Sequence, residues 1–388
     1  MISLPRLTVG IVTYNSARTI SQTLRSLAQQ TLPSSRWKIL FVDHNSQDET
    51  SAAIARFISE NPELHSDFIR REDNNLARSR QFILESAQTP WTAFIDSDVV
   101  LPMNWFENAL TNAEASTCVP ESAAAKKWAG IAGPLRLRPL SHRLREVEIL
   151  QGQSLGHFGS EQMMISKKYL RKATHLPTAA VLFRTKVLLE NGGFNTSLKC
   201  CGEDLEIGER LRARGFEFWI ASQLEVDHLL SIQSKWGWWR RTFLFGRARV
   251  RVARLHPMLF MNYRLWLPLG FALTQILISA ALLVLYGPHL GPVLAALAGF
   301  WCFHLLTLGF SFFRFRKTHS VWRAALLLAL THQAYAWGEF YELLNPLNFF
   351  KTASEKAPEK TPENTIEPRG RRVFRRPNWF KALALRKT

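Results

Sequence analysis

The stretch Trp91-Thr-Ala-Phe-Ile-Asp96-Ser-Asp98-Val-Val100 is a short apolar run that ends in two carboxylates two positions apart. Such a run is typical of a buried strand. Side chains at i and i+2 of an extended chain face the same way, so Asp96 and Asp98 can point into one site. Their charges would repel, and Mg²⁺ or Mn²⁺, which prefers oxygen ligands, would relieve this repulsion. The alternative is a solvated turn, because Asp-Ser-Asp is also common in turns.

Two earlier apolar runs end in polar residues in the same way. Residues 7–13 run into Tyr14 and Asn15, and residues 37–42 are followed by Asp43. Apolar residues at helical spacing come after each run, so strands alternate with helices. This alternation predicts a mostly parallel sheet flanked by helices, in which ligands bind beyond the carboxyl ends of the strands. We therefore expect these polar residues to meet in one crevice.

The residues around this crevice suit a nucleotide better than a dinucleotide. Asp43 stands where an α/β nucleotide site often places a carboxylate for a ribose, although Asp43 and its neighbours are also good helix caps. Neither G-x-G-x-x-G nor a phosphate-binding P-loop motif follows the first run. Arg78, at the start of a predicted helix, could pair with a phosphate, and a surface salt bridge is the alternative.

The formal net charge of +18 invites a nucleic-acid interpretation, but the distribution of the charge argues against it. Basic residues crowd into residues 240–254, 314–317 and the tail from 351. Residues 266–286 and 290–313 contain no Asp, Glu, Lys or Arg, and each segment is long enough to cross a membrane as a helix. Basic residues that flank such segments mark the cytoplasmic side and attract anionic lipid. Membrane topology therefore explains the charge, and we expect no nucleic-acid partner.

The middle of the chain carries no pattern that predicts an element. Residues 113–129 and 134–164 are rich in small and polar residues. We expect an acceptor-side loop that orders when substrate binds, or a plain surface insertion.

Several motifs follow the strand ends in a fixed order. They are His175-Leu-Pro-Thr-Ala-Ala-Val-Leu-Phe-Arg184, Asn191-Gly-Gly-Phe-Asn195, Cys201-Gly-Glu203-Asp204 and Val226-Asp-His228. Together with Ile95-Asp-Ser-Asp98, this ordered set resembles the inverting glycosyltransferases of family 2, over roughly residues 6–255. The resemblance implies an α/β fold of the GT-A type, with a mostly parallel sheet flanked by helices, followed here by C-terminal transmembrane and interfacial helices. The Gln-x-x-Arg-Trp motif of the processive synthases in that family is absent from the sequence.

The resemblance also implies a role for each matching residue. Asp204 would be the base that deprotonates the acceptor hydroxyl, with Glu203 as a secondary candidate. Asp98 would be the direct metal ligand, with Asp96 beside it, and the ion would be Mg²⁺ or Mn²⁺. The predicted donor-binding residues are Thr13, Tyr14, Asn15, Asp43, Arg78, Asp96, His228 and Arg247.

These observations divide the chain into four regions. Residues 1–235 form the predicted GT-A glycosyltransferase domain, and residues 236–262 form amphipathic interfacial helices. Residues 263–345 form a membrane region of two transmembrane helices and a third apolar or in-plane helix, and residues 346–388 are a basic, disordered tail. An arginine stripe in the second region would lie at the headgroup level or bind a diphosphate, and it consists of Arg240, Arg247, Arg251 and Arg254.

The expected activity is metal-assisted transfer of a sugar, with inversion, from a nucleotide-sugar donor to a hydroxyl of a lipid-linked or glycan acceptor. The expected location is the cytoplasmic membrane of a bacterium, with the catalytic domain in the cytosol, where nucleotide sugars are made. The alternative is a catalytically silent membrane scaffold of a glycan assembly complex. The intact carboxylates at Asp43, Asp96, Asp98 and Asp204 count against this alternative.

Overall fold

A computed structural model describes the chain over residues 5–72, 75–117, 127–148, 170–173, 175–199, 201–259, 261, 263–286, 291, 294, 295, 298 and 321–345. The second predicted crossing, residues 290–313, lies almost wholly outside the described residues, and so does the basic tail.

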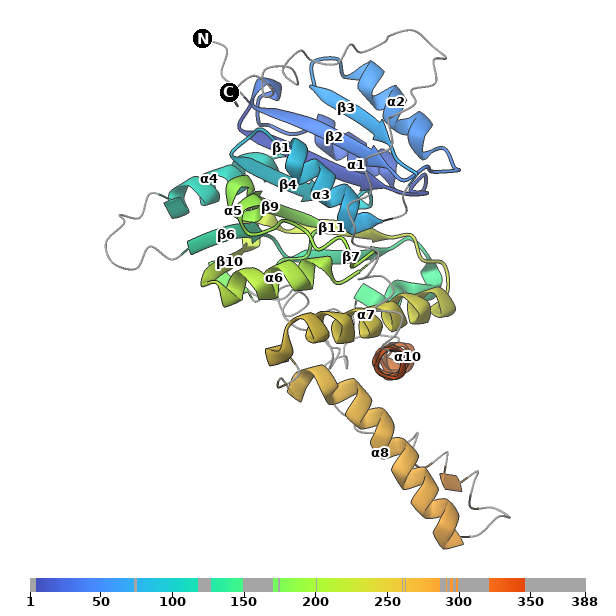
Figure 1. Cartoon of the computed structure of the whole chain (residues 1–388). Helices are drawn as coiled ribbons and strands as arrows, with labels where there is room; N and C mark the ends of the chain where they lie inside the picture. The colour runs from blue at the N-terminus through green and yellow to red at the C-terminus, as the bar shows by residue number, and fades with distance from the viewer. Residues whose placement is uncertain are drawn as a thin grey trace.

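The core is an eight-stranded sheet in the order β3-β2-β1-β4-β9-β6-β10-β8 (Figure 1). Its first half consists of parallel neighbours, β3 (Ser66–Arg70), β2 (Trp37–Asp43), β1 (Leu7–Thr13) and β4 (Trp91–Ile95). Every residue of β1 and β4 is buried, which explains why both read as nearly continuous apolar runs. The predicted α/β class and the mostly parallel sheet are confirmed.

The second half of the sheet is mixed. Strand β9 (Ala180–Arg184) runs antiparallel between β4 and β6 (Lys127–Ala132). Strand β10 (Phe216–Ala221) is parallel to β6, and β8 (Leu170–Ala173) closes the edge. Because β9 pairs along all of β4, the two halves meet directly beside the strand that leads to Asp96.

Helices cover both faces of the sheet. One buried apolar cluster contains residues of α1 (Ile20–Ala28), α2 (Thr50–Glu60) and α4 (Trp105–Thr117). A second cluster contains residues of α3 (Leu76–Ser86), α5 (Thr185–Glu190) and α6 (Glu203–Ala213). The sheet therefore lies between two helical layers, as the strand and helix alternation predicts.

A three-stranded sheet of β5 (Val99–Val100), β11 (Val226–Leu230) and β7 (Leu135–Pro139) lies beyond the carboxyl end of β4. The prediction of a loop over residues 113–129 and 134–164 is wrong for β6, β7 and the 3-10 helix His142–Glu148. The remaining residues of those two segments fall mainly outside the described part of the chain.

The C-terminal region places α7 (Lys235–Leu255) against α10 (Val321–Leu344). The two helices approach closely at two glycines, since a Cβ on Gly246 would lie 2.3 Å from the Tyr335 carbonyl oxygen and one on Gly338 2.1 Å from that of Phe243. Glu342 of α10 is fully buried and receives ion pairs from three members of the predicted stripe, Arg247, Arg251 and Arg254. Those three arginines therefore fix α10.

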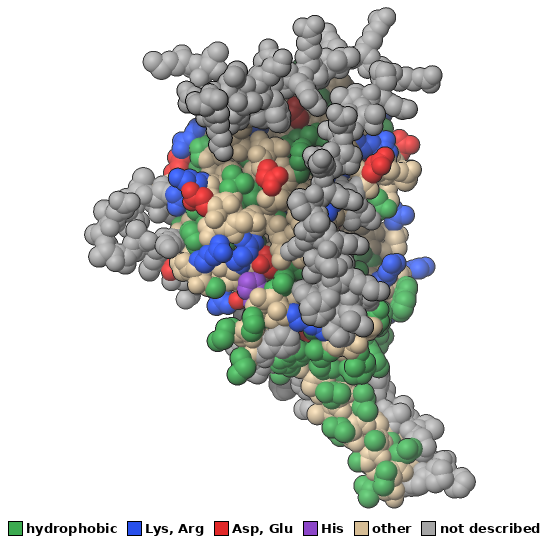
Figure 2. Space-filling view, in the orientation of Figure 1, with side chains coloured by type: hydrophobic (Ala, Val, Ile, Leu, Met, Phe, Trp, Pro, Cys, Tyr) green, Lys and Arg blue, Asp and Glu red, His purple; other side chains and the backbone are tan. Residues whose placement is uncertain are grey.

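Helix α8 (Tyr263–Tyr286) extends away from the rest of the molecule (Figure 1). Residues Trp266–Leu285 have a mean hydropathy of 2.1 and are only 12% buried. Figure 2 shows hydrophobic side chains gathered on this helix and at the end of the molecule next to it. In the described part of the chain, α8 is the one helix with the length and composition to cross a membrane.

Candidate active site

Thr13 and Asp43 lie side by side at the carboxyl ends of β1 and β2. The Thr13 hydroxyl donates to Asp43 Oδ1 at 2.6 Å, and Ser46 donates to both oxygens of the same carboxylate. Ser51 donates to Oδ2 at 3.1 Å. The acceptor positions of this fully buried carboxylate are thereby used inside the protein. Asp43 orders the strand-end loops here, and its contact with a nucleoside stays a prediction.

Tyr14 and Asn15 form the loop that leaves β1. Asn15 has a left-handed backbone with φ of 47°, a conformation that asparagine tolerates better than most residues. Its backbone N–H donates to Ser46 Oγ, and its Oδ1 accepts from the Gln47 N–H, both at 2.9 Å. Tyr14 is half exposed beside these loops. An exposed ring at the strand ends is a surface on which a base can stack, which suits the predicted nucleoside contact.

Asp96, Asp98 and His228 come together beyond β4. One ligand atom from each lies within 4.8 Å of the other two. Asp98 Oδ1 is 3.2 Å from His228 Nε2. His228 Nδ1 is buried and has no hydrogen-bond partner among the residues that the structure describes. Two carboxylates and an imidazole are a donor set for a divalent cation, so these residues fit the expected Mg²⁺ or Mn²⁺.

The small sheet explains why residues so far apart in sequence meet. In the antiparallel pair of β5 and β11, His228 lies opposite Val99, the residue after Asp98. The Leu229 N–H also donates to the Asp98 carbonyl oxygen at 2.7 Å. The backbone ladder therefore fixes the imidazole beside the carboxylate.

The two carboxylates differ in how readily they ionise. Burial raises the pKa of Asp96, an effect that Arg80 opposes and Asp98 reinforces. Burial also acts on Asp98, but the adjacent His228 outweighs it and holds the pKa of Asp98 below its ordinary value. Asp98 therefore stays ionised more readily, which suits its predicted role as the direct metal ligand.

Arg80 connects the metal cluster to the Gly-Glu-Asp motif, and the sequence analysis assigns it no role. Its guanidinium is almost fully buried, donates to Asp96 Oδ1 at 2.6 Å and forms an ion pair with Glu203. The sequence did hold a signal, because Arg80 follows Leu76 by four residues and precedes Ile83 by three. That spacing places Arg80 on the buried face of α3.

Glu203 and Asp204 begin α6 but lie in different surroundings. Glu203 is buried, one of its oxygens is held by Arg80, and Oε2 has no hydrogen-bond partner in the described residues. Burial raises the pKa of Glu203 to about 7, with Arg80 opposing this effect and Asp204 adding to it. Asp204 is partly exposed, and its Oδ1 accepts from the Leu205 N–H at 2.7 Å. Of the two carboxylates, Asp204 is the more accessible to an acceptor.

Arg78 and Arg247 lie away from this cluster. Arg78 is exposed on α3, two residues before the buried Arg80. Arg247 donates from Nε to Glu342 Oε2 at 2.8 Å, and its guanidinium lies 4.7 Å from the ring centroid of Tyr341. Their roles in donor binding stay predictions, to which the geometry adds no support.

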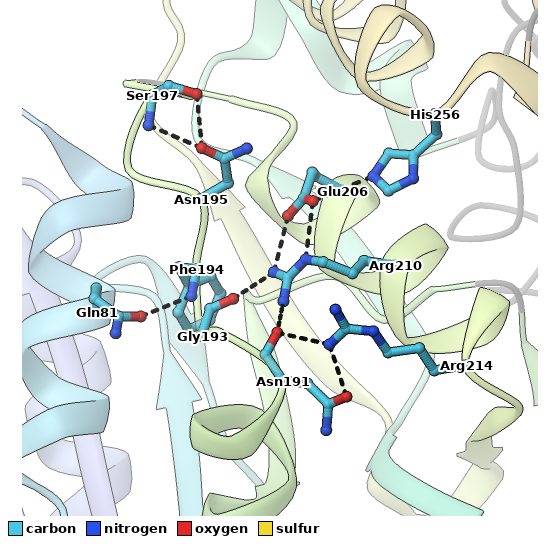
Figure 3. A network of polar contacts seen from close by, with 10 residues as sticks. All are labelled: Gln81, Asn191, Gly193, Phe194, Asn195, Ser197, Glu206, Arg210, Arg214 and His256. Carbon is cyan, nitrogen blue, oxygen red and sulfur yellow. Dashed lines mark hydrogen bonds and ion pairs between the residues drawn. The ribbon is translucent and has the colours of Figure 1, made fainter. Parts of the chain in front are cut away.

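The Asn191-Gly-Gly-Phe-Asn195 motif holds α6 in place (Figure 3). Arg210 of α6 forms hydrogen bonds with the Asn191 and Gly193 carbonyl oxygens and with the Glu206 carboxylate. His256, just after α7, contacts Glu206 Oε1 at 3.2 Å. The motif is thus bound to the helix that begins with the candidate base.

Several candidate residues line one cleft of about 410 Å³, and Asp98 lies beside two of them, Asp96 and His228, without being part of the lining. Its polar side is formed by Arg80, Asp96, His175, Glu203, Asp204 and His228. Its apolar side is formed mainly by Leu135, Leu137, Leu230, Trp238, Leu244, Phe245, Ala248 and Tyr335. The structure therefore gathers the predicted metal and base residues, while Thr13, Tyr14, Asn15 and Asp43 lie at the neighbouring strand ends outside the lining.

Sequence comparison finds glycosyltransferases that are similar to part of this chain. Residues 8–171 match the family model described as Glycosyl transferase family 2. Over 109 residues, or 28% of the chain, the sequence is 29% identical to the glycosyltransferase AglE of Haloferax volcanii, and the match spans 36% of that protein.

Among solved structures, the mannosyltransferase PcManGT from Pyrobaculum calidifontis, in complex with GDP-Man and Mn²⁺, superimposes with a TM-score of 0.57. The alignment covers 88% of each chain at 16% sequence identity. This similarity shows the shared fold.

Proposed function

Because residues 8–171 match the glycosyl transferase family 2 model, we propose that the protein is a membrane-anchored inverting glycosyltransferase that moves a sugar from a nucleotide-sugar donor to an acceptor hydroxyl. The observation that carries the proposal is that Asp96, His228 and Asp204 line one cleft, with Asp98 in the same cluster as Asp96 and His228. The acceptor is a lipid-linked or glycan molecule.

The chemistry is a single displacement. The acceptor oxygen forms a bond to the anomeric carbon while the bond from that carbon to the diphosphate oxygen breaks, and the diphosphate leaves with the electron pair. Asp204 takes the proton that the acceptor hydroxyl loses. Attack from the side opposite the leaving group inverts the configuration at the anomeric carbon.

The other residues prepare this step. Asp96, Asp98 and His228 would hold a divalent cation, which when bound supplies positive charge that stabilises the diphosphate leaving group. Arg80 holds Asp96 and Glu203 in fixed positions, so it is a positioning residue between the donor and acceptor sides. Tyr14 and Asn15 contact the nucleoside, and Asp43 keeps their loop in place.

The C-terminal helices support the proposed location. Helix α8 anchors the chain in the cytoplasmic membrane, with the catalytic domain on the cytosolic side, where nucleotide sugars are made. The aromatic residues at the start of α7 support this placement, because Trp236 is largely exposed and stacks on Trp239 at a centroid distance of 4.9 Å. Exposed tryptophans of this kind favour the headgroup region of a bilayer.

The proposal is tested with the purified full-length chain and a panel of UDP-, GDP- and dTDP-linked sugars. We expect slow hydrolysis of one donor with Mn²⁺ or Mg²⁺, and no hydrolysis in excess chelator. Failure of every nucleotide sugar to bind or react in either metal would overturn the proposal.

A further inference from the structure

The cleft has an apolar side that sugar transfer itself does not use. It is built from α7, α10 and the small sheet, and its aliphatic members are Leu135, Leu137, Leu230, Leu244 and Ala248. Aliphatic side chains make no hydrogen bonds to a carbohydrate, so these five residues offer a polysaccharide no polar contact. It suits an alkyl or prenyl chain, whose burial gains roughly 0.8 kcal/mol for each methylene group.

This apolar side is rigidly built. The close approach at Gly246 and Gly338 sets the spacing of α7 and α10. Arg249 and Glu339, both buried, form an ion pair at 3.0 Å across the two helices. Trp238 Nε1 donates to Thr331 Oγ1 at 2.8 Å. The apolar surface is thus held open by its own framework, as ligand pockets usually are.

Arg241 of α7 lines the same cleft as the polar and apolar residues. Its guanidinium lies 5.5 Å from the ring centroid of Phe245. Four other arginines of α7 form ion pairs with Glu339 or Glu342, namely Arg247, Arg249, Arg251 and Arg254. Arg241 forms no ion pair with any residue that the structure describes, although its charge acts on Asp98. A guanidinium placed in this way suits a phosphate.

We propose that the acceptor is a lipid phosphate that carries a sugar, with its phosphate bound by Arg241 and its hydrocarbon chain along the apolar side of the cleft. The sugar hydroxyl then lies toward Asp204, on the polar side. This inference rests on the proposed function and decides between its two acceptor classes. The apolar helix α8 begins eight residues after α7 ends, so a ligand chain that leaves the cleft has the bilayer close by.

The test uses the full-length protein in amphipol and three probes that separate the parts of the ligand. They are radiolabelled decyl phosphate, decanol and inorganic phosphate, with binding measured by equilibrium dialysis against an amphipol blank. The variants are Arg241→Gln and Leu244→Asn, and the matched control is Arg240→Gln. Arg240 is the neighbouring arginine of α7, is exposed and does not line the cleft.

We expect decyl phosphate to bind at least tenfold more tightly than decanol or inorganic phosphate. Arg241→Gln should weaken the binding of decyl phosphate at least tenfold and leave the binding of decanol unchanged. Leu244→Asn should weaken the binding of both decyl phosphate and decanol. Arg240→Gln should bind all three probes as the wild type does.

Three outcomes would overturn the inference: no binding of decyl phosphate, equal binding of decyl phosphate and decanol, or an Arg241→Gln variant that loses affinity for the nucleotide sugar alone. The last result would assign Arg241 to the donor diphosphate. Metal-dependent donor hydrolysis by the wild type is measured in parallel. If it persists while decyl phosphate fails to bind, the acceptor assignment is wrong and the proposed function stands.

Discussion

At the scale of single residues, the two carboxylates that begin α6 differ enough to be separated by experiment. Asp204→Asn keeps the size of the side chain but cannot accept the acceptor proton. We expect donor and metal binding to survive while transfer falls by roughly 10²- to 10⁴-fold, the usual contribution of a positioned base. If Asp204 only stabilised the first helical turn, its replacement by asparagine would cost about 1 kcal/mol of stability or less and leave transfer intact.

Glu203→Gln is the matched comparison for Asp204→Asn. Glu203 is clamped by Arg80, so its amide variant should lose thermal stability more than it loses chemistry. Donor affinity, transfer rate and melting temperature are measured side by side. If Asp204→Asn transfers at the wild-type rate, Asp204 is not the base. If Glu203→Gln is the slower enzyme with an unchanged melting temperature, Glu203 is the base.

Asp98→Asn tests the metal site. The asparagine amide is a weaker ligand than the carboxylate, one of three that converge here. Changes in groups that only support metal ligands already lower metal affinity or activity 10- to 100-fold, so transfer should fall by about 100-fold or more. The measurement is Mn²⁺-dependent binding of the donor by calorimetry together with transfer. Asp227→Asn is the control, because Asp227 neighbours His228 but pairs with Arg136 and Arg138 outside the cluster. Equal loss in both variants would contradict the assignment.

The sequence predicts some of the site residues and not others. Asp96 and Asp98 could be found because two carboxylates follow a buried apolar run, but they lie in the turn after β4 and not on the strand itself, with the Val99 N–H donating to the Asp96 carbonyl oxygen at 3.2 Å. His228 needed the whole order of motifs. Arg80 and Glu203 form a pair 123 positions apart in the chain. No local pattern predicts such a pairing, because only the tertiary fold brings Arg80 of α3 to the first turn of α6.

At the scale of elements, the strands rich in Val, Ile and Leu were predicted correctly and β6 was not. The sequence of β6 is Lys-Trp-Ala-Gly-Ile-Ala, which lacks the β-branched run expected of a strand. The structure gives the reason for the small residues. A Cβ on Gly130 would lie 2.5 Å from the Phe183 ring, and one on Gly133 would lie 1.7 Å from the Leu224 carbonyl oxygen. Close packing against neighbours distant in sequence thus requires small residues here, and a run of small residues is more typical of a loop than of a strand.

The contacts of α6 give a prediction about pH. Burial acts to raise the pKa of Glu206, but hydrogen bonds from His256 and Arg210 outweigh it and depress that pKa. A depressed pKa means that the pairing stabilises the fold above the ordinary glutamate pKa and is lost as the pH falls through the depressed value. Glu206→Gln should therefore cost about 2 kcal/mol at pH 7, a cost that shrinks as the pH falls below the ordinary glutamate pKa and through the depressed value.

Thermal unfolding of the wild type and Glu206→Gln across this pH range measures the effect. The control is Glu190→Gln, since Glu190 pairs with Lys186 on the surface at 3.6 Å. An exposed pair of this kind contributes less than about 1 kcal/mol. A stability difference for Glu206→Gln that does not change with pH would show that shape, and not charge, is what the side chain supplies.

At the scale of the whole molecule, α8 makes the membrane prediction testable. Ile276 lies near the middle of the apolar span and is 54% exposed. An arginine at the centre of a membrane helix costs about 3 kcal/mol in insertion. Ile276→Arg should therefore lower the fraction of protein that resists alkaline carbonate extraction.

Met258→Arg is the control for this measurement. Met258 is 81% exposed but lies in the short 3-10 helix before α8. Its variant should fractionate as the wild type does. If Ile276→Arg and the wild type are extracted alike, α8 does not span the bilayer.

The Arg80 bridge also bears on how such an enzyme could be recombined. Arg80 and Asp96 lie within the matched family segment at residues 8–171, and Glu203 lies beyond it. A chimaera that joined this segment to the acceptor half of a relative would therefore inherit the buried cation from one parent and its counter-ion from the other. If the second parent lacked a glutamate at that place, the hybrid would keep Asp96 and Asp98 and still fold poorly, because a buried guanidinium would lose half of its neutralising charge. The crossover point for exchanging donor specificity is thus limited by this pair, and because His228 completes the metal cluster from β11, the segment to move as one block runs from β1 through β11.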